Sequence, residues 1–238
     1  ILNPGHGPKN TGVFDPGAVG PTGVREADIN LAVARLLAPL LEAAGAEVLL
    51  IRDGDLGDVT AQANASGGDY FISLHCNSFG EPSAQGTETY VYQADSPAKG
   101  LAEAIQAAAV KVLGTTDRGI KTAGYYVLRK TAMPALLVEL AFLSNPAEEG
   151  LLADAGTQQR LALALAEAII ECLGIRPAAA AEQVQVTLHG EEGQKEFMGR
   201  LIDGVTYLPA RAVLEALGYQ VAVSYTHLRA NETRRHLV

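Results

Sequence analysis

The sequence predicts an α/β fold, in which a mixed, mostly parallel sheet is flanked by helices on both faces, plus a small C-terminal α+β module. Short apolar runs typical of buried strands alternate with longer segments of helical periodicity over residues 1–174. Hydrophobic residues make up 48% of the 238 residues, enough to bury a sizeable core. After Gly174 the composition changes and a shorter set of patterns begins.

The first elements follow from apolar spacing and turn residues. Apolar residues recur at helical spacing from Ile29 to Ala44, and Gly45 is a typical residue just past a helix end. Pro39 lies inside this helix and is expected to kink it. The other elements expected here are an initial strand at Ile1-Leu2, a buried strand at 46–51, a short helix at 60–65 and a strand at 70–75.

The same alternation continues after residue 80. Ser96 can cap a helix that carries Pro97 in its first turn and runs to Gly114. The remaining expected elements are a strand at 87–92, a short strand at 125–128, an apolar strand around Glu139 and a long helix at about 157–173.

The sequence after Gly174 divides into three parts. The Pro- and Ala-rich composition around residue 178 indicates a linker, and the strand pattern that follows indicates a new module. The end of the chain is basic and lacks any pattern, which is typical of a cloning or assembly scar. We expect a linker at 175–183, a partial module at 184–223 with strands at 184–188 and 205–209 and a helix at 211–217, and a tail of doubtful origin at 224–238.

Charge and composition restrict the partners. The formal net charge of −9 and the absence of clustered Lys and Arg disfavour nucleic acid. No apolar stretch reaches the ~20 residues of a transmembrane helix. Cys76 and Cys172 are too few for a disulfide framework. Because the chain begins inside an expected strand, we expect that an upstream part, including a leader, has been removed. The sequence sets no oligomeric state.

Four side chains stand where the backbone is expected to present them. His6 follows the first strand, Glu26 opens a helix, His75 closes the strand at 70–75 and Glu139 interrupts an apolar strand. Two imidazoles and one carboxylate are a common ligand set for a catalytic zinc, which keeps a position open for water. Ligands of open α/β sheets collect beyond the carboxyl ends of strands. Taken singly, the first three residues also fit a turn histidine, a helix N-terminal acid and a core histidine.

Glu139 needs a partner because an ionised, unpaired carboxylate inside an apolar strand is costly. A structural ion pair with Arg129 or Arg118 would supply one. The alternative is a role as base beside a zinc-bound water. Zinc lowers the pKa of a water from 15.7 toward ~7, and a neighbouring carboxylate can take its proton.

These residues lie in four motifs that follow one another along residues 1–174. The motifs are Asn3-Pro4-Gly5-His6-Gly7, Asp15-Pro16-Gly17-Ala18 with Gly23 and Glu26, Ser73-Leu74-His75-Cys76-Asn77-Ser78, and Pro134-Ala135-Leu136-Leu137-Val138-Glu139 with Phe142-Leu143-Ser144-Asn145. Together they closely resemble the zinc-dependent N-acetylmuramoyl-L-alanine amidases of the amidase-3 type.

The resemblance implies a zinc ion held by His6, Glu26 and His75, with Glu139 as catalytic base and acid. It implies hydrolysis of the amide between the lactyl group of N-acetylmuramic acid and the L-alanine of the peptidoglycan stem. Asn77 and Arg129 are expected to help orient the substrate or the base.

Three residues depart from the family pattern. Asn3 stands where aspartate is common, Cys76 where alanine is usual and Ala141 where glycine is frequent. None removes a ligand or the base, so the departures concern the tuning of the site. We expect Cys76 to be a small buried neighbour; a fourth ligand is the alternative.

Residues 184–223 resemble the start of a copper amine oxidase N-terminal-like module, a companion of wall enzymes thought to bind or anchor. We expect no copper site there, because His189, His227 and His236 share no ligand spacing. The sequence contains neither a P-loop nor a Gly-x-Ser-x-Gly elbow. The leading hypothesis is therefore a secreted, cell-wall peptidoglycan amidase. The alternatives are a zinc peptidase acting within the stem peptide and a non-catalytic, wall-binding regulator.

Overall fold

The computed structural model describes residues 1–176, 182–190, 193–202 and 205–207. The chain divides into two compact units, Ile1–Pro177 and Ala178–Val238. No helix in the described ranges is long and apolar enough to cross a membrane.

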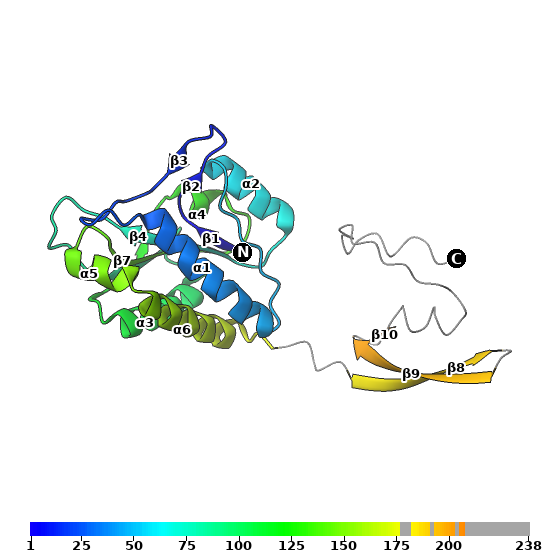
Figure 1. Cartoon of the computed structure of the whole chain (residues 1–238). Helices are drawn as coiled ribbons and strands as arrows, with labels where there is room; N and C mark the ends of the chain where they lie inside the picture. Colours follow the sequence, from blue (N-terminus) through cyan, green and yellow to red (C-terminus); the bar gives the residue numbers. More distant parts are fainter. Residues whose placement is uncertain (177–181, 191–192, 203–204, 208–238) are drawn as a thin grey trace. The chain divides into compact units, whose positions relative to one another are not determined.

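A five-stranded sheet forms the centre of the first unit (Figure 1). Its order is β1-β4-β7-β5-β6. The pairs β1–β4, β4–β7 and β5–β6 are parallel, and β5–β7 is antiparallel. The predicted mixed, mostly parallel sheet is thus confirmed. The strands are β1 (Leu2–Pro4), β4 (Phe71–Asn77), β5 (Thr87–Val91), β6 (Asp117–Thr122) and β7 (Ala135–Phe142).

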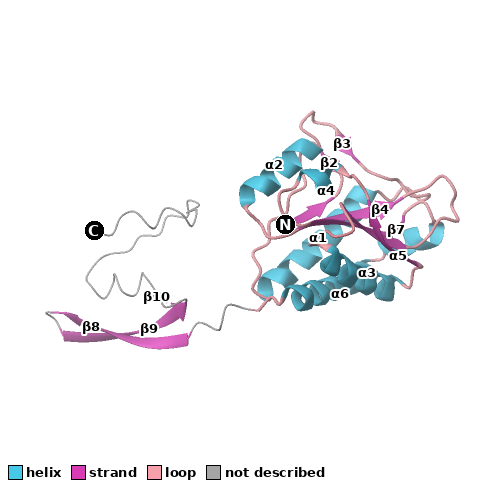
Figure 2. Cartoon of the chain, turned by 180° about the vertical axis from the view of Figure 1, so that it is seen from behind, coloured by secondary structure: helices cyan, strands magenta, loops and turns pink. Residues whose placement is uncertain are grey.

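Helices cover both faces of this sheet, as predicted (Figure 2). Successive residues of a strand point to opposite faces, so Leu136 of β7 joins one core and Leu137 the other. The helices of the larger core are α1 (Glu26–Ala43), α3 (Lys99–Leu113) and α6 (Ala155–Leu173), while α2 (Leu56–Ser66) and α4 (Tyr126–Lys130) cover the opposite face, and α5 (Pro146–Ala153) follows β7.

Two predicted strands are wrong. Residues 46–51 pair with β1 only through an isolated bridge, Leu2 to Leu50, and among them only Ile51 is buried. Residues 125–128 lie mostly in the short helix α4. A run of four apolar residues fits a buried strand and a buried helical turn equally well, so periodicity could not separate them. The hairpin of β2 (Gly7–Pro8) and β3 (Phe14–Asp15) was not predicted.

The second unit contains an antiparallel sheet of order β10-β9-β8. The strand β8 begins at Glu182, so the predicted linker at 175–183 overlaps its start. The predicted helix at 211–217 and the tail at 224–238 lie outside the described residues. The strands are β8 (Glu182–Gly190), β9 (Gly193–Ile202) and β10 (Val205–Tyr207).

Candidate metal centre

His6 lies directly after β1 in a backbone conformation that side chains rarely adopt. Its φ is 64°, and in the part of the chain that the structure describes it is the only non-glycine residue with a positive φ. This left-handed conformation costs roughly 1–2 kcal/mol in a residue that carries a Cβ. The turn directs the imidazole back over the carboxyl end of the sheet, beside His75 of β4.

Glycines leave room for the imidazoles. A Cβ on Gly17 would lie 2.6 Å from Cδ2 of His6 and 2.5 Å from Oε2 of Glu26, and a Cβ on Gly5 would overlap the ring of His75. Gly5 and Gly17 therefore have a direct steric reason. Any larger residue would displace one of the three side chains.

The three predicted zinc ligands lie together. Nε2 of His6 is 3.2 Å from Oε2 of Glu26, and Nδ1 of His75 is 2.9 Å from Oε1 of the same carboxylate. Each of the three residues has a potential metal-binding atom that lies within 4.8 Å of such an atom on the other two. The two rings meet edge to face, with centroids 5.1 Å apart.

Glu26 is held from several directions. It is the first residue of α1 and is only 4% exposed. Its Oε2 accepts a hydrogen bond from the backbone N–H of Ala18, and its Oε1 accepts one from the N–H of Cys76. The amide of Asn30, one turn along α1, donates to Oε1 and also to the carbonyl of Gly5. Asn30 thus ties the carboxylate to the turn that carries His6.

The charges of the cluster are strongly coupled. Burial lowers the pKa of His6, but Glu26 and Asp15 outweigh it and raise that pKa to about 9 from 6.5. Burial raises the pKa of Glu26, but hydrogen bonds from His6 and His75 outweigh it and hold that pKa well below its ordinary value. Without a metal, the carboxylate is therefore ionised beside a protonated His6. A divalent cation can replace that proton, because metal binding and deprotonation of the ligands are linked.

The donor set fits zinc. Two imidazole nitrogens and one carboxylate oxygen match the three protein ligands of a catalytic zinc site, with a fourth position left for water. Nδ1 of His6 is buried without a hydrogen-bond partner among the described residues, although Oδ2 of Asp15 lies 3.1 Å away. This nitrogen is positioned for Asp15 to orient the ring, as carboxylates commonly orient metal-binding histidines.

Glu139 projects from β7 next to the cluster. In the sheet register it lies beside His75 of β4 on one side and Glu88 of β5 on the other. Its Oε2 is buried and has no hydrogen-bond partner among the described residues. Burial is the main cause that raises the pKa of Glu139 from 4.5 to about 7. Within the described ranges it forms no ion pair with Arg118 or Arg129, so a structural pair as its explanation is wrong.

A cavity of about 710 Å³ opens over these residues and is lined by His6, His75 and Glu139. Leu56, at the start of α2, and Tyr125 and Tyr126, at the start of α4, form part of its wall. Lys9 and Arg52 add positive charge along the same space. The cavity thus offers an apolar wall, cations and a carboxylate of raised pKa beside three side chains that could hold a metal ion.

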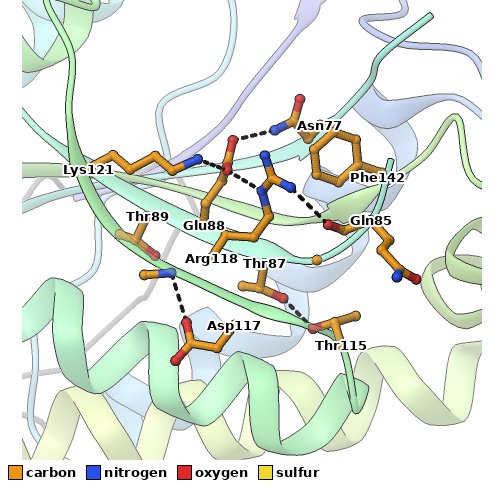
Figure 3. A network of polar contacts seen from close by, with 12 residues as sticks. Asn77, Gln85, Thr87, Glu88, Thr89, Thr115, Asp117, Arg118, Lys121 and Phe142 are labelled. Atoms are coloured by element: carbon orange, nitrogen blue, oxygen red, sulfur yellow. Dashed lines mark hydrogen bonds and ion pairs between the residues drawn. The ribbon is translucent and has the colours of Figure 1, made fainter. Parts of the chain in front are cut away.

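Glu88 is a buried acid that the sequence analysis missed. It is 3% exposed, and its carboxylate accepts hydrogen bonds from Nε of Arg118, Nζ of Lys121 and Nδ2 of Asn77 (Figure 3). The hydroxyl of Tyr90 donates to the same carboxylate. Burial raises its pKa, but these donors outweigh burial and lower the pKa to about 2. The available signal was the strand Thr87–Val91, whose period places Glu88 and Tyr90 on one face.

Asn77 and Arg129 have different surroundings. The amide nitrogen of Asn77 binds Glu88, 2.7 Å away, and its oxygen accepts from the N–H of Ser78. Arg129 is exposed in the last turn of α4 and is not among the residues that line the cavity. The structure therefore links Asn77 to the neighbour of Glu139, while a substrate contact of Arg129 stays a prediction.

The three departures from the family pattern lie in the interior. The amide of Asn3 donates to the carbonyl of Ile51, and its oxygen accepts from Ser73. Cys76 is buried, and burial raises the pKa of its thiol well above the ordinary value. Its Sγ lies against Asn30 and does not belong to the cluster of His6, Glu26 and His75. This favours a role of Cys76 as a small buried neighbour over a role as fourth ligand. Ala141 is fully buried in β7.

Comparison with known proteins gives a consistent result. Residues 1–171 match the family Amidase_3, described as N-acetylmuramoyl-L-alanine amidase. The chain is 37% identical over 172 residues to the N-acetylmuramoyl-L-alanine amidase LytC of Bacillus subtilis (strain 168), a match that covers 69% of this chain and 33% of LytC. It is 34% identical over 183 residues to the sporulation-specific N-acetylmuramoyl-L-alanine amidase of the same strain, covering 74% of this chain and 68% of that protein.

A solved structure shows the same fold. The catalytic domain of CwlV, an N-acetylmuramoyl-L-alanine amidase from Bacillus (Paenibacillus) polymyxa var. colistinus, superposes with a TM-score of 0.67 at 34% identity. The alignment covers 74% of this chain and 97% of that domain. The chain therefore contains nearly the whole of such a domain, while it spans about a third of the length of LytC.

Proposed function

Because the chain belongs to the Amidase_3 family of N-acetylmuramoyl-L-alanine amidases, we propose that residues 1–174 form a zinc-dependent catalytic domain that hydrolyses peptidoglycan. The bond cleaved is the amide between N-acetylmuramic acid and the L-alanine of the stem peptide. The single observation that carries this proposal is that His6, Glu26 and His75 lie together beside Glu139, whose buried Oε2 has no hydrogen-bond partner among the described residues. We propose that the protein acts on the cell wall outside the cell, where its substrate lies.

His6, Glu26 and His75 would hold the zinc ion. When bound, zinc supplies a Lewis acid that polarises the scissile carbonyl and makes a water molecule more acidic. Asn30, Ala18 and Cys76 keep Glu26 in place, so its oxygens stay directed at the imidazoles. Such support is worth about 10–100-fold in metal affinity in other zinc sites.

Glu139 would move the proton. Its Oε2 accepts the proton of the attacking water and later delivers it to the nitrogen of the departing L-alanine, so the carboxylate is regenerated. A pKa of about 7 suits both steps, because a group that must accept and then release a proton works best near the ambient pH.

The decisive experiment measures metal and products in one sample. Metal-loaded protein is incubated with purified peptidoglycan, and the products are identified by mass spectrometry beside a chelator-treated sample. We expect one zinc per chain, new free lactyl carboxylates and new free amino groups on L-alanine, and loss of activity with the chelator that zinc restores. Cleavage between stem residues would instead identify a peptidase. Binding to the wall without any cleavage would identify a non-catalytic regulator.

We also propose that the second unit is a partial copper amine oxidase N-terminal-like module with a role in wall binding. The sequence resemblance of residues 184–223 supports this proposal, together with the described strands β8, β9 and β10. A sedimentation assay with purified wall tests it, comparing the full chain with a variant that ends at Arg176. Equal sedimentation of the two proteins would contradict it.

A further inference from the structure

The strands β5 and β6 run opposite to β1, β4 and β7, and they carry a second polar group beside the metal cluster. Across the strand order β1-β4-β7-β5-β6, the side chains met in turn are His6, His75, Glu139 and Glu88, and then the cations of β6. The first three have roles in the proposed reaction. The group formed by Glu88, Arg118 and Lys121, here termed the edge cluster, does not (Figure 3).

The edge cluster has an excess of positive charge. Glu88 contributes one negative charge, because its pKa is lowered to about 2, and Arg118 and Lys121 contribute two positive charges. Both cationic side chains are 37% exposed, whereas Glu88 is nearly fully buried. Solvent therefore meets the cations rather than the acid. This positive surface belongs to a chain whose formal net charge is −9.

The two cations are held in fixed positions and keep donors to spare. Arg118 donates from Nε to Glu88 and from Nη1 to the carbonyl of Gln85, and its guanidinium lies 5.0 Å from the ring centre of Phe142. Lys121 donates to Glu88. A guanidinium has five N–H donors and an ammonium has three, which is more than these acceptors use. The remaining donors can bind an anion.

The edge cluster is joined to the cavity of the metal centre. The hydroxyl of Tyr90 donates to Glu88, and the Tyr90 ring packs edge to face against Tyr125, with centroids 5.1 Å apart. Tyr125 lines the cavity. A substrate that reaches past Glu139 toward β5 and β6 therefore meets the exposed cations after the tyrosine pair.

We propose that Arg118 and Lys121 form a subsite for a carboxylate carried by the stem peptide, a few residues from the scissile bond. This inference rests on the proposed amidase function and names the substrate feature that the site prefers. Two strand spacings separate β7 from β6, about 10 Å at ~4.8 Å each. An extended peptide advances ~3.3–3.6 Å per residue, so the subsite meets an acidic group on about the second or third residue.

The test uses two synthetic muropeptides that differ only at the acidic residue following L-alanine, which carries a free carboxylate in one and a carboxamide in the other. The wild-type enzyme should hydrolyse the carboxylate form with a kcat/KM roughly tenfold higher, as expected for loss of one charge-assisted contact. The preference should decrease with added salt, since exposed charges are screened.

Lys121→Gln is the first variant, because Glu88 keeps its hydrogen bonds from Arg118, Tyr90 and Asn77. We expect the preference for the carboxylate form to fall at least about threefold, mainly through KM. Arg118→Gln should lower it further. Lys111→Gln, which removes an exposed lysine from the last turn of α3, is the matched control and should keep the full preference.

The outcomes separate this inference from the amidase function. Equal hydrolysis of the two muropeptides by the wild-type enzyme would overturn the subsite while leaving the function in place. A preference that survives in both variants would do the same. If the metal-loaded enzyme hydrolysed neither muropeptide, the proposed function would fail first. Binding of both muropeptides to metal-loaded Glu139→Gln by calorimetry gives the same comparison without turnover.

Discussion

Glu139 on β7 and Glu88 on β5 lie opposite each other across an antiparallel strand pair, on the same face of the sheet. Glu88 accepts hydrogen bonds from four side chains, and its pKa is about 2. Glu139 has a buried Oε2 without a partner among the described residues, and its pKa is about 7. The two carboxylates are in register but occupy opposite electrostatic environments.

The difference shows that burial alone does not decide the role of a buried acid. Glu88 is 3% exposed and yet has the lower pKa, because the cations and donors around it outweigh desolvation. Glu139 lacks such donors, so desolvation dominates. Glu88, whose carboxylate accepts four hydrogen bonds, holds its neighbours in place. Glu139, whose Oε2 has no partner among the described residues, can exchange a proton.

Replacement of Glu139, the proposed proton carrier, should have the largest effect. In Glu139→Gln the side-chain volume is retained but no proton can be accepted, so turnover should fall by ~10²–10⁴. Zinc content and folding should be retained, because Glu139 is not among the three grouped metal donors. Steady-state hydrolysis of muropeptides, with metal analysis of the same sample, measures both. A turnover loss of equal size in Glu88→Gln would break the division of roles between the two acids.

Loss of support for the metal ligands should have the next largest effect. Asn30 is fully buried, and its amide donates to Glu26 and to the carbonyl of Gly5. Asn30→Ala should therefore weaken zinc binding by about 10–100-fold, measured by competition with a chromophoric chelator. Asn64→Ala removes an exposed amide at the end of α2 and serves as control. Equal zinc affinity in the two variants would show that Asn30 does not hold Glu26.

Much of this arrangement could be predicted from the sequence. The alternation of apolar runs and helical segments predicted the mixed, mostly parallel sheet with helices on both faces, and the structure confirms it. The site residues could be singled out because polar groups at strand ends and inside apolar strands need a reason. His6, Glu26, His75 and Glu139 carry that signal, and the structure brings all four together.

The parts that could not be predicted depend on contacts between strands distant in sequence. Arg118 was a candidate partner of Glu139, but the register of β5 and β6 places it on Glu88 instead. Glu88 itself stands between Thr87 and Thr89, where a polar residue in a strand attracts no attention. Its burial comes from a crossover through α3 that places β6 beside β5, which no local pattern reveals.

The two acids should also differ in the sign of their effect on stability. In the folded state the pKa of Glu139 is raised to about 7, whereas the ordinary pKa of a glutamate is 4.5. The unfolded chain therefore releases this proton first as the pH rises, and the folded state loses stability between these values. Metal-free Glu139→Gln avoids this loss and should be more stable than metal-free wild type above pH 7, by at most about 3 kcal/mol. Urea unfolding at several pH values should show the two proteins converging below pH 4.5. A variant less stable than wild type at pH 8 would contradict a raised pKa.

Glu88→Gln should act in the opposite direction. The folded pKa of Glu88, about 2, lies below its ordinary value of 4.5, so its ionised form adds stability above pH 4.5 that is lost as the pH falls toward 2. We expect the variant to be roughly 1–3 kcal/mol less stable at pH 7. The loss stays moderate because Arg118 and Lys121 are each 37% exposed and water can solvate them.

Gln keeps one acceptor oxygen for Tyr90 and Asn77, so the variant removes the charge of Glu88 together with its hydrogen bonds from Arg118 and Lys121. Urea unfolding of the variant and of wild type should show a difference at pH 7 that narrows steadily below pH 4.5. A difference that stays constant down to pH 2 would mean that Glu88 acts through packing. In that case only Glu139 would change stability through its ionisation, and the two acids would not act in opposite directions.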